Sequence, residues 1–97
     1  MTRQVVLEIL SKALPDLRVR FGVSTLALFG SVARDEAGPE SDVDLLVAFE
    51  WRAHFRAFMG LQFALEELLG AKVDLVTVKA LRPFTMQFIE NDLIDVA

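Results

Sequence analysis

Residues 28–49, with the sequence LFGSVARDEAGPESDVDLLVAF, join two apolar segments through a polar connection. The apolar run of residues 25–29 is bounded by Gly30, which predicts a short buried strand. Residues 42–49 alternate at first and then become apolar, which predicts a strand near the centre of a sheet. The connection is expected to form a short helix over residues 31–36 and then a turn over residues 37–40.

The flanking sequence adds helices and one more strand. An apolar stripe over residues 5–14 predicts an amphipathic helix, which Pro15 is expected to end. Further along the chain, we expect a helix over residues 52–69 that Gly70 closes. A valine-rich strand over residues 72–78 and a short helix over residues 85–91 should follow. Together these elements predict an α/β (α+β) fold, in which a small mixed β-sheet is flanked by helices.

The length and the hydrophobic content bound the domain organisation. A chain of 97 residues is long enough for one domain and too short for two, so residues 1–97 are expected to form a single domain. Hydrophobic residues make up 54% of the chain and include eight Phe. Because a domain of this size has a thin core, part of this apolar surface is expected to face a partner subunit in a hetero-oligomer. A core that is simply well packed is the alternative.

The charge and the residue types narrow the class of substrate. A net charge of −4, with no basic stripe, argues against binding an extended nucleic acid. Charged residues interrupt every apolar stretch before the ~20 residues that a membrane-spanning helix needs, and residues 1–10 do not resemble a signal peptide. The chain has no cysteine, which excludes disulfides and thiolate chemistry and fits a cytoplasmic protein.

A Gly-Ser pair follows the first predicted strand and precedes a predicted helix. Gly30 lets the backbone approach a ligand without a Cβ atom in the way. Ser31 offers a hydroxyl, and the N–H groups of a first helical turn point toward any anion bound there. This pair is therefore a candidate phosphate cradle, although strand–Gly–Ser–helix connections also occur for purely structural reasons.

Acidic residues occur on two of the predicted strands. Asp42 and Asp44 lie two residues apart, so on a strand their side chains point to the same face, ~6–7 Å apart along the chain. Asp74 lies in the next predicted strand and would join them if the two strands were neighbours. Oxygen ligands without nearby His or Cys suit Mg²⁺ or Mn²⁺. Two such ions ~3.5–4 Å apart can stabilise the attacking and leaving oxygens in a displacement at phosphorus. The alternative is that Asp42 and Asp44 simply face solvent on an edge strand.

These motifs together resemble the minimal nucleotidyltransferase family, which consists of short relatives of the DNA polymerase β superfamily. The resemblance rests on the following residues: Gly30-Ser31-x-x-Arg34, Ser41-Asp42-x-Asp44-Leu45 and Asp74 within Val73-Asp74-Leu75-Val76-Thr77. It extends from about Ile9 to Pro83 and implies a polymerase β palm-like fold. Some members of the family act as antitoxins to a helical toxin of the HEPN class. The sequence departs from close relatives after Pro83, where it has no basic residue.

The resemblance implies a role for each residue that matches the motif. Gly30 and Ser31 would hold the β- and γ-phosphates of a nucleoside triphosphate, and Ser41 belongs to the same nucleotide-binding set. Asp42, Asp44 and Asp74 would be catalytic and would ligate two Mg²⁺ ions, with Asp74 also helping to deprotonate the acceptor. For Arg34 two roles stay open. It either contacts the phosphates or the acceptor, or it pairs with Asp35 or Glu36 as a structural residue.

The implied reaction is transfer of AMP from ATP to a hydroxyl group. In relatives that pair with toxins, the acceptor is a tyrosine of the partner protein. This chain contains no Tyr, so a tyrosine acceptor must belong to another chain, and a HEPN-type toxin is the expected partner. Two alternatives remain: an antitoxin that neutralises its toxin by binding alone, and a transferase that acts on RNA ends or a small molecule.

The predicted helix over residues 52–69 offers a candidate contact surface. Its inward face is expected to pack on the sheet through Phe58, Leu61, Leu65, Leu68 and Leu69. Met59 and Phe63 fall on another side among charged residues and resemble an interface anchor, unless they pack under a terminal helix. Packing roles are expected for the residues at its start: Trp51, His54 (packing or surface) and Phe55.

Overall fold

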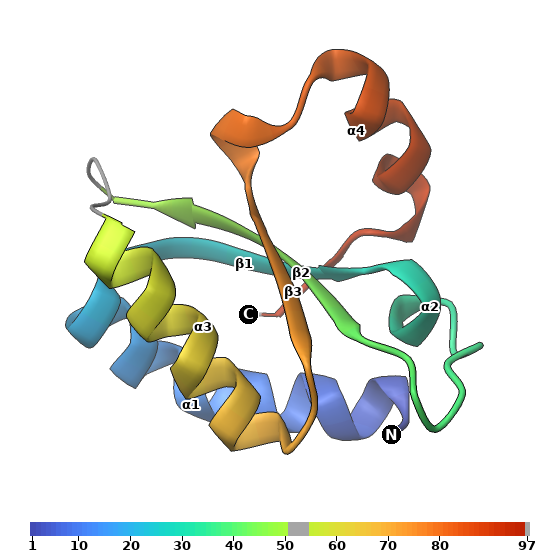
Figure 1. The fold of residues 1–97 in the computed structure, drawn as a ribbon, viewed down its shortest axis with the longest axis horizontal. Helices are drawn as coiled ribbons and strands as arrows, with labels where there is room; N and C mark the ends of the chain where they lie inside the picture. The colour runs from blue at the N-terminus through green and yellow to red at the C-terminus, as the bar shows by residue number, and fades with distance from the viewer. Residues whose placement is uncertain (51–54, 97) are drawn as a thin grey trace.

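The computed structural model describes residues 1–50 and 55–96, which form two layers of helices around one sheet (Figure 1). The helices are α1 (Arg3–Phe21), α2 (Gly30–Ala33), α3 (Phe55–Leu69) and α4 (Pro83–Ile89), with 3₁₀ helices η1 (Val78–Ala80) and η2 (Glu90–Asp92). The strands are β1 (Val23–Phe29), β2 (Val43–Phe49), β3 (Val73–Thr77) and β4 (Ile94–Asp95). Trp51, His54 and the predicted helix start at Arg52 lie outside the described residues.

The sheet has four strands in the order β3-β2-β1-β4. Strand β1 pairs antiparallel with β2 and with β4, whereas β2 pairs parallel with β3. The sheet is therefore mixed, β2 lies inside it, and the predicted fold class is confirmed. The two-residue strand β4 and the two 3₁₀ helices were not predicted, because such short elements have no periodic pattern.

The sheet separates two apolar clusters of different size. Alternate residues of its strands pack against α1 and α3 in the larger cluster, among them Leu28, Leu45 and Leu75. The residues between them face the other side, where Phe29 and Leu46 form a smaller cluster with part of the C-terminal segment. Because side chains alternate along a strand, Asp44 and Asp74 belong to this second face. The face opposite α1 and α3 therefore holds the acidic residues.

Helix α1 does not end at Pro15, so that prediction is wrong. The helix continues to Phe21 because Leu17 extends the apolar stripe by one more turn and is 1% exposed. Burial of a leucine contributes about 1.5–3 kcal/mol, which is comparable to the ~3 kcal/mol cost of a proline inside a helix. Gly22 ends the helix instead, with φ 71° and an N–H that donates to the carbonyl of Arg18.

The structure confirms most of the predicted inward face of helix α3. Leu61, Leu65 and Leu69 are buried, and Phe58 packs against the same cluster. The prediction for Leu68 is wrong, since its side chain is 43% exposed. Leu68 lies at the edge of the buried stripe and lines a groove beside α1.

That groove, of about 710 Å³, lies between the outer parts of α1 and α3. Its lining residues are Ala13, Asp16, Arg20, Gly60, Phe63, Ala64, Glu67 and Leu68. Phe63 is 62% exposed, so no terminal helix among the described residues covers it, while Met59 is only partly exposed. A contact with another chain through these two residues stays a prediction. Phe55, expected to pack, is 79% exposed because it precedes the first buried residue of α3, Leu61, by nearly two turns.

No helix among residues 1–50 and 55–96 is both long and apolar enough to cross a membrane.

Candidate active site

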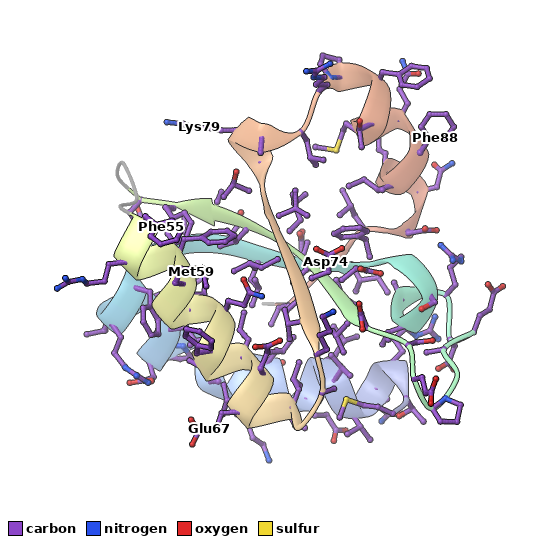
Figure 2. All side chains as sticks on the ribbon, viewed as in Figure 1. Phe55, Met59, Glu67, Asp74, Lys79 and Phe88 are labelled. Atoms are coloured by element: carbon purple, nitrogen blue, oxygen red, sulfur yellow. The ribbon has the colours of Figure 1, made fainter. Side chains whose placement is uncertain are left out.

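Two of the predicted acidic residues face one another across neighbouring strands. Asp44 on β2 and Asp74 on β3 are register partners in the parallel pair, so the condition on which Asp74 could join the site is met. Figure 2 shows Asp74 near the middle of the molecule, on the strand that crosses in front of β2. Parallel register places both side chains on the same face of the sheet. Asp42 immediately precedes β2 and acts on Asp44 through its charge.

The local electrostatics raise the pKa of Asp44 to about 6, from an ordinary value of 3.8. Burial is the largest cause, followed by the negative charges of Asp74 and Asp42 and by a hydrogen bond with Asp74, while Arg34 acts in the opposite direction. A carboxyl group in this position is ionised only against the repulsion of its neighbours. A proton or a bound cation would relieve that repulsion.

The donor set fits a hard divalent cation only in part. Asp44 and Asp74 supply oxygen ligands of the kind that Mg²⁺ and Mn²⁺ prefer. Within the described residues, however, no group of three or more His, Cys, Asp or Glu side chains is gathered closely enough to hold a metal ion. Asp42 would have to join the other two on binding, so the metal site stays a prediction.

Gly30 lies directly against the carboxylate of Asp44. Its φ is +76°, a backbone conformation that L side chains rarely adopt, and a Cβ atom added there would collide with Oδ2 of Asp44. Gly30 also begins α2, and its carbonyl accepts a hydrogen bond from the N–H of Arg34 at 3.1 Å. The sharp entry into α2 therefore brings the backbone of Gly30 next to the carboxylate of Asp44. The phosphate cradle stays a prediction.

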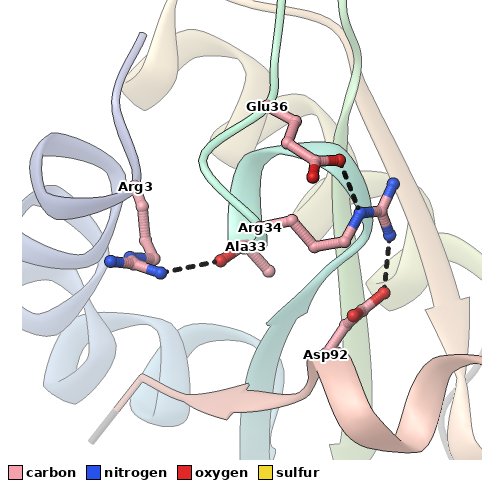
Figure 3. A network of polar contacts seen from close by, with 5 residues as sticks. All are labelled: Arg3, Ala33, Arg34, Glu36 and Asp92. Carbon is pink, nitrogen blue, oxygen red and sulfur yellow. Dashed lines mark hydrogen bonds and ion pairs between the residues drawn. The ribbon is translucent and has the colours of Figure 1, made fainter.

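Arg34 forms two ion pairs, shown in Figure 3. Its Nε donates to Glu36 at 3.1 Å, and its Nη1 donates to Asp92 at 2.6 Å. Of the two predicted pairing partners, Glu36 is present, whereas Asp35 instead accepts a hydrogen bond from the backbone N–H of Arg3. Asp92 was not predicted, because 58 residues separate it from Arg34 and no local pattern links them. The hydrogen bonds of Glu36 and Asp92 raise the pKa of Arg34.

Ser41 closes the loop before β2. Its Oγ accepts a hydrogen bond from the N–H of Gly38 at 2.9 Å, and its own N–H donates to the carbonyl of Gly38 at 3.2 Å. These bonds fix the approach to Asp42. A direct contact of Ser41 with a nucleotide stays a prediction, as do the nucleotide contacts of Gly30, Ser31 and Arg34.

Replacing Asp44 with Asn is expected to raise the melting temperature of the metal-free protein at pH 7.5. Because the pKa of Asp44 is higher in the folded protein, its ionised form opposes folding. The protonated carboxyl group stabilises the fold fully below pH 3.8, and this stabilisation is lost as the pH rises through about 6. The neutral amide avoids this loss. Thermal melts in EDTA should show a difference between variant and wild type at pH 7.5 that shrinks at pH 5. An equal difference at both pH values would contradict the assignment.

Replacing Arg34 with Gln is expected to loosen the C-terminal segment. The ion pair with Asp92 ties η2 to the end of α2, but Arg34 is an exposed residue, so its contribution to global stability is small. Hydrogen exchange followed by mass spectrometry should therefore become faster in residues 90–96, with little change in melting temperature. Arg18→Gln, the same change at an exposed arginine of α1, is the control. Unchanged exchange in residues 90–96 would mean that Arg34 does not hold this segment.

Comparison with known proteins adds independent observations. The profile of the nucleotidyltransferase domain family matches residues 10–96. Protein adenylyltransferase MntA of Thermococcus cleftensis is 43% identical over 82 residues, which span 84% of this chain and 83% of the relative. A solved structure named as a proposed minimal nucleotidyltransferase matches with a TM-score of 0.81 and 38% identity, covering 97% of this chain and 95% of that chain.

A more distant match concerns a complex. A chain in the structure of a tri-AMPylated Shewanella oneidensis HEPN toxin with MNT antitoxin has a TM-score of 0.70 and 21% identity. The match covers 99% of this chain and 72% of that chain. At this level of identity the likeness concerns the fold alone.

Proposed function

The chain belongs to the nucleotidyltransferase domain family, and from this membership we propose that it is a Mg²⁺-dependent protein adenylyltransferase and antitoxin. Its substrate is ATP, and its acceptor is a hydroxyl group, namely a tyrosine of a HEPN-type toxin. The observation that carries the proposal is the register pair of Asp44 and Asp74 beside the backbone of Gly30. It puts the carboxylate of Asp44, the register partner of Asp74, next to the candidate phosphate-binding turn. The reaction is cytoplasmic in this proposal.

Five of the site residues have a defined part in the proposed reaction. Gly30 and Ser31 would hold the terminal phosphates, and Asp42, Asp44 and Asp74 would hold two Mg²⁺ ions once Asp42 joins the other two carboxylates. When bound, the ions lower the pKa of the acceptor hydroxyl and neutralise charge on the phosphate oxygens. Asp74 accepts the proton as the hydroxyl oxygen bonds to the α-phosphorus. The bond from that phosphorus to its bridging oxygen breaks, and pyrophosphate leaves.

The partner protein in this proposal supplies the acceptor. The chain itself contains no Tyr. The AMPylated HEPN toxin of Shewanella oneidensis, in complex with an MNT antitoxin, supports a toxin as the modified protein. The name of the Thermococcus cleftensis relative supports adenylyl transfer as the chemistry.

The test is incubation of the purified chain with α-labelled ATP, Mg²⁺ and the HEPN-type protein from the same genome. The partner should become labelled and heavier by whole AMP units in mass spectra. An unmodified partner, with ATP and with the other nucleoside triphosphates, would contradict the proposal. An Asp42→Asn/Asp44→Asn variant that neutralises the co-expressed toxin as well as wild type would favour an antitoxin that acts by binding alone.

A further inference from the structure

Arg34 ends the short helical turn that begins at Gly30. Its backbone N–H donates to the carbonyl of Gly30 at 3.1 Å, and Gly30 lies directly against the carboxylate of Asp44. The positive charge of Arg34 also acts on Asp44, where it opposes the causes that raise the pKa of that carboxyl group. Geometry and electrostatics therefore agree that the charge of Arg34 belongs to the candidate active site.

Two acidic side chains hold the guanidinium group of Arg34 from different sides (Figure 3). Glu36 accepts a hydrogen bond from Nε at 3.1 Å, and Asp92 accepts one from Nη1 at 2.6 Å. Within residues 1–50 and 55–96, Nη2 has no hydrogen-bond partner. Because the N–H donors of an arginine form a planar fork, the two ion pairs leave donors for an anion that binds at the site.

Asp92 is the more firmly held of the two acids. The side chain of Glu36 is 66% exposed and follows α2 in a loop, whereas the side chain of Asp92 is 19% exposed. Asp92 lies in η2 between Ile89 and Leu93, which both pack against the smaller apolar cluster. This packing on either side fixes the backbone of Asp92, and its side chain is short. The position of the guanidinium group therefore depends on Asp92 more than on Glu36.

We propose that Asp92 is a positioning residue, which holds the guanidinium group of Arg34 where it binds the phosphate groups of ATP. The inference rests on the proposed function and adds to it the parts of Arg34 and Asp92 in ATP binding. A side chain that is already held in its bound orientation loses little conformational freedom when the ligand arrives, so binding is tighter. Asp92 contacts Arg34 and acts on ATP only through that contact.

Other roles of Asp92 predict a different change when its charge is removed. The negative charge of Asp92 by itself repels ATP, and a carboxylate that competed with the phosphates for Arg34 would weaken binding further. Under either of these roles, neutralising Asp92 would tighten the binding of ATP. A role confined to holding the chain end would leave the affinity unchanged. Positioning alone predicts weaker binding, because the guanidinium group loses its anchor.

The experiment is calorimetric titration of the full chain with ATP in the presence of Mg²⁺. Arg34→Gln is expected to raise the Kd for ATP about 10-fold or more, as loss of a hydrogen bond to a charged group does. Asp92→Asn should raise the Kd at least about fivefold, and Asp92→Glu, which keeps the charge, should recover most of the affinity. Glu90→Gln removes an exposed acid from the same 3₁₀ helix and is the matched control, so it should leave the Kd unchanged.

The double variant Arg34→Gln/Asp92→Asn tests whether Asp92 acts through Arg34. It should bind ATP no more weakly than Arg34→Gln alone, because Asp92 has no guanidinium group to hold in that background. In steady-state transfer, Asp92→Asn should raise the KM for ATP, whereas the KM for the HEPN-type protein should not change. Melting temperatures close to that of wild type are expected for all variants, since ion pairs of exposed arginines contribute little to stability.

Three outcomes would overturn the positioning role. They are an unchanged or lower Kd in Asp92→Asn, an equal loss of affinity in Glu90→Gln, and a further loss in the double variant beyond that of Arg34→Gln. Failure of the proposed function gives a separate result. If wild type binds ATP but transfers no AMP, the adenylyltransferase proposal fails, and the Kd values still decide the role of Asp92. Absence of ATP binding by wild type would overturn the positioning role itself.

Discussion

The double variant Asp42→Asn/Asp44→Asn is expected to lose at least about 10³-fold in the rate of AMP transfer. Residues that merely support a metal ligand contribute about 10–100-fold, so loss of two direct ligands should cost more. The chain offers Asp74 as the only remaining acid of the predicted set, and one carboxylate cannot bind two ions. Single-turnover transfer of labelled AMP at saturating Mg²⁺ measures the effect.

The matched control is Asp16→Asn, which makes the same chemical change on α1. Asp16 is exposed and, among residues 1–50 and 55–96, pairs with Arg20 in the neighbouring turn, so its loss should not change the rate. A melting temperature of the double variant at or above that of wild type would exclude loss of folding as the cause of its inactivity. Transfer within tenfold of wild type would show that Asp42 and Asp44 are not the metal ligands.

The strands of the site could be predicted from local patterns, but the pairing of one strand with another could not. The apolar run before Gly30 and the apolar segment after Asp-x-Asp are clear local signals for buried strands, and both strands are present. Whether Asp74 lies beside Asp44 depends on which strand pairs with which, and this is a property of the whole sheet. The parallel pairing of β2 and β3 answers that question. The crossover through α3 is the usual way for a chain to make such a pair.

The wrong predictions arise where tertiary contacts override local preference. Pro15 is a strong local signal for a helix end, but the buried Leu17 carries α1 past it. The ion pair between Arg34 and Asp92 depends on the return of the chain end to the side of α2. The sequence leaves the role of Arg34 open, because Asp92 is distant from it along the chain.

Replacing Gly30 with Ala is expected to impair the site through two separate effects. An alanine with φ near +76° costs about 1–2 kcal/mol in backbone strain. Its Cβ would also collide with Oδ2 of Asp44, so the carboxylate or the turn has to move. Because a displacement of about 1 Å at a reacting centre can cost about 10²-fold, transfer should fall by at least that factor. Single-turnover kinetics and thermal melts measure the two effects on the same preparation.

Gly70→Ala separates backbone strain from the collision. Gly70 also has a left-handed backbone, with φ +61°, but a Cβ atom there would meet nothing within 4 Å. Both variants should therefore lose a similar ~1–2 kcal/mol of folding free energy to strain, and Gly30→Ala somewhat more. Only Gly30→Ala should lose transfer activity at temperatures where both proteins are folded. If the two variants retained equal activity, the contact between Gly30 and Asp44 would have no part in the reaction, and the phosphate cradle would have to lie elsewhere.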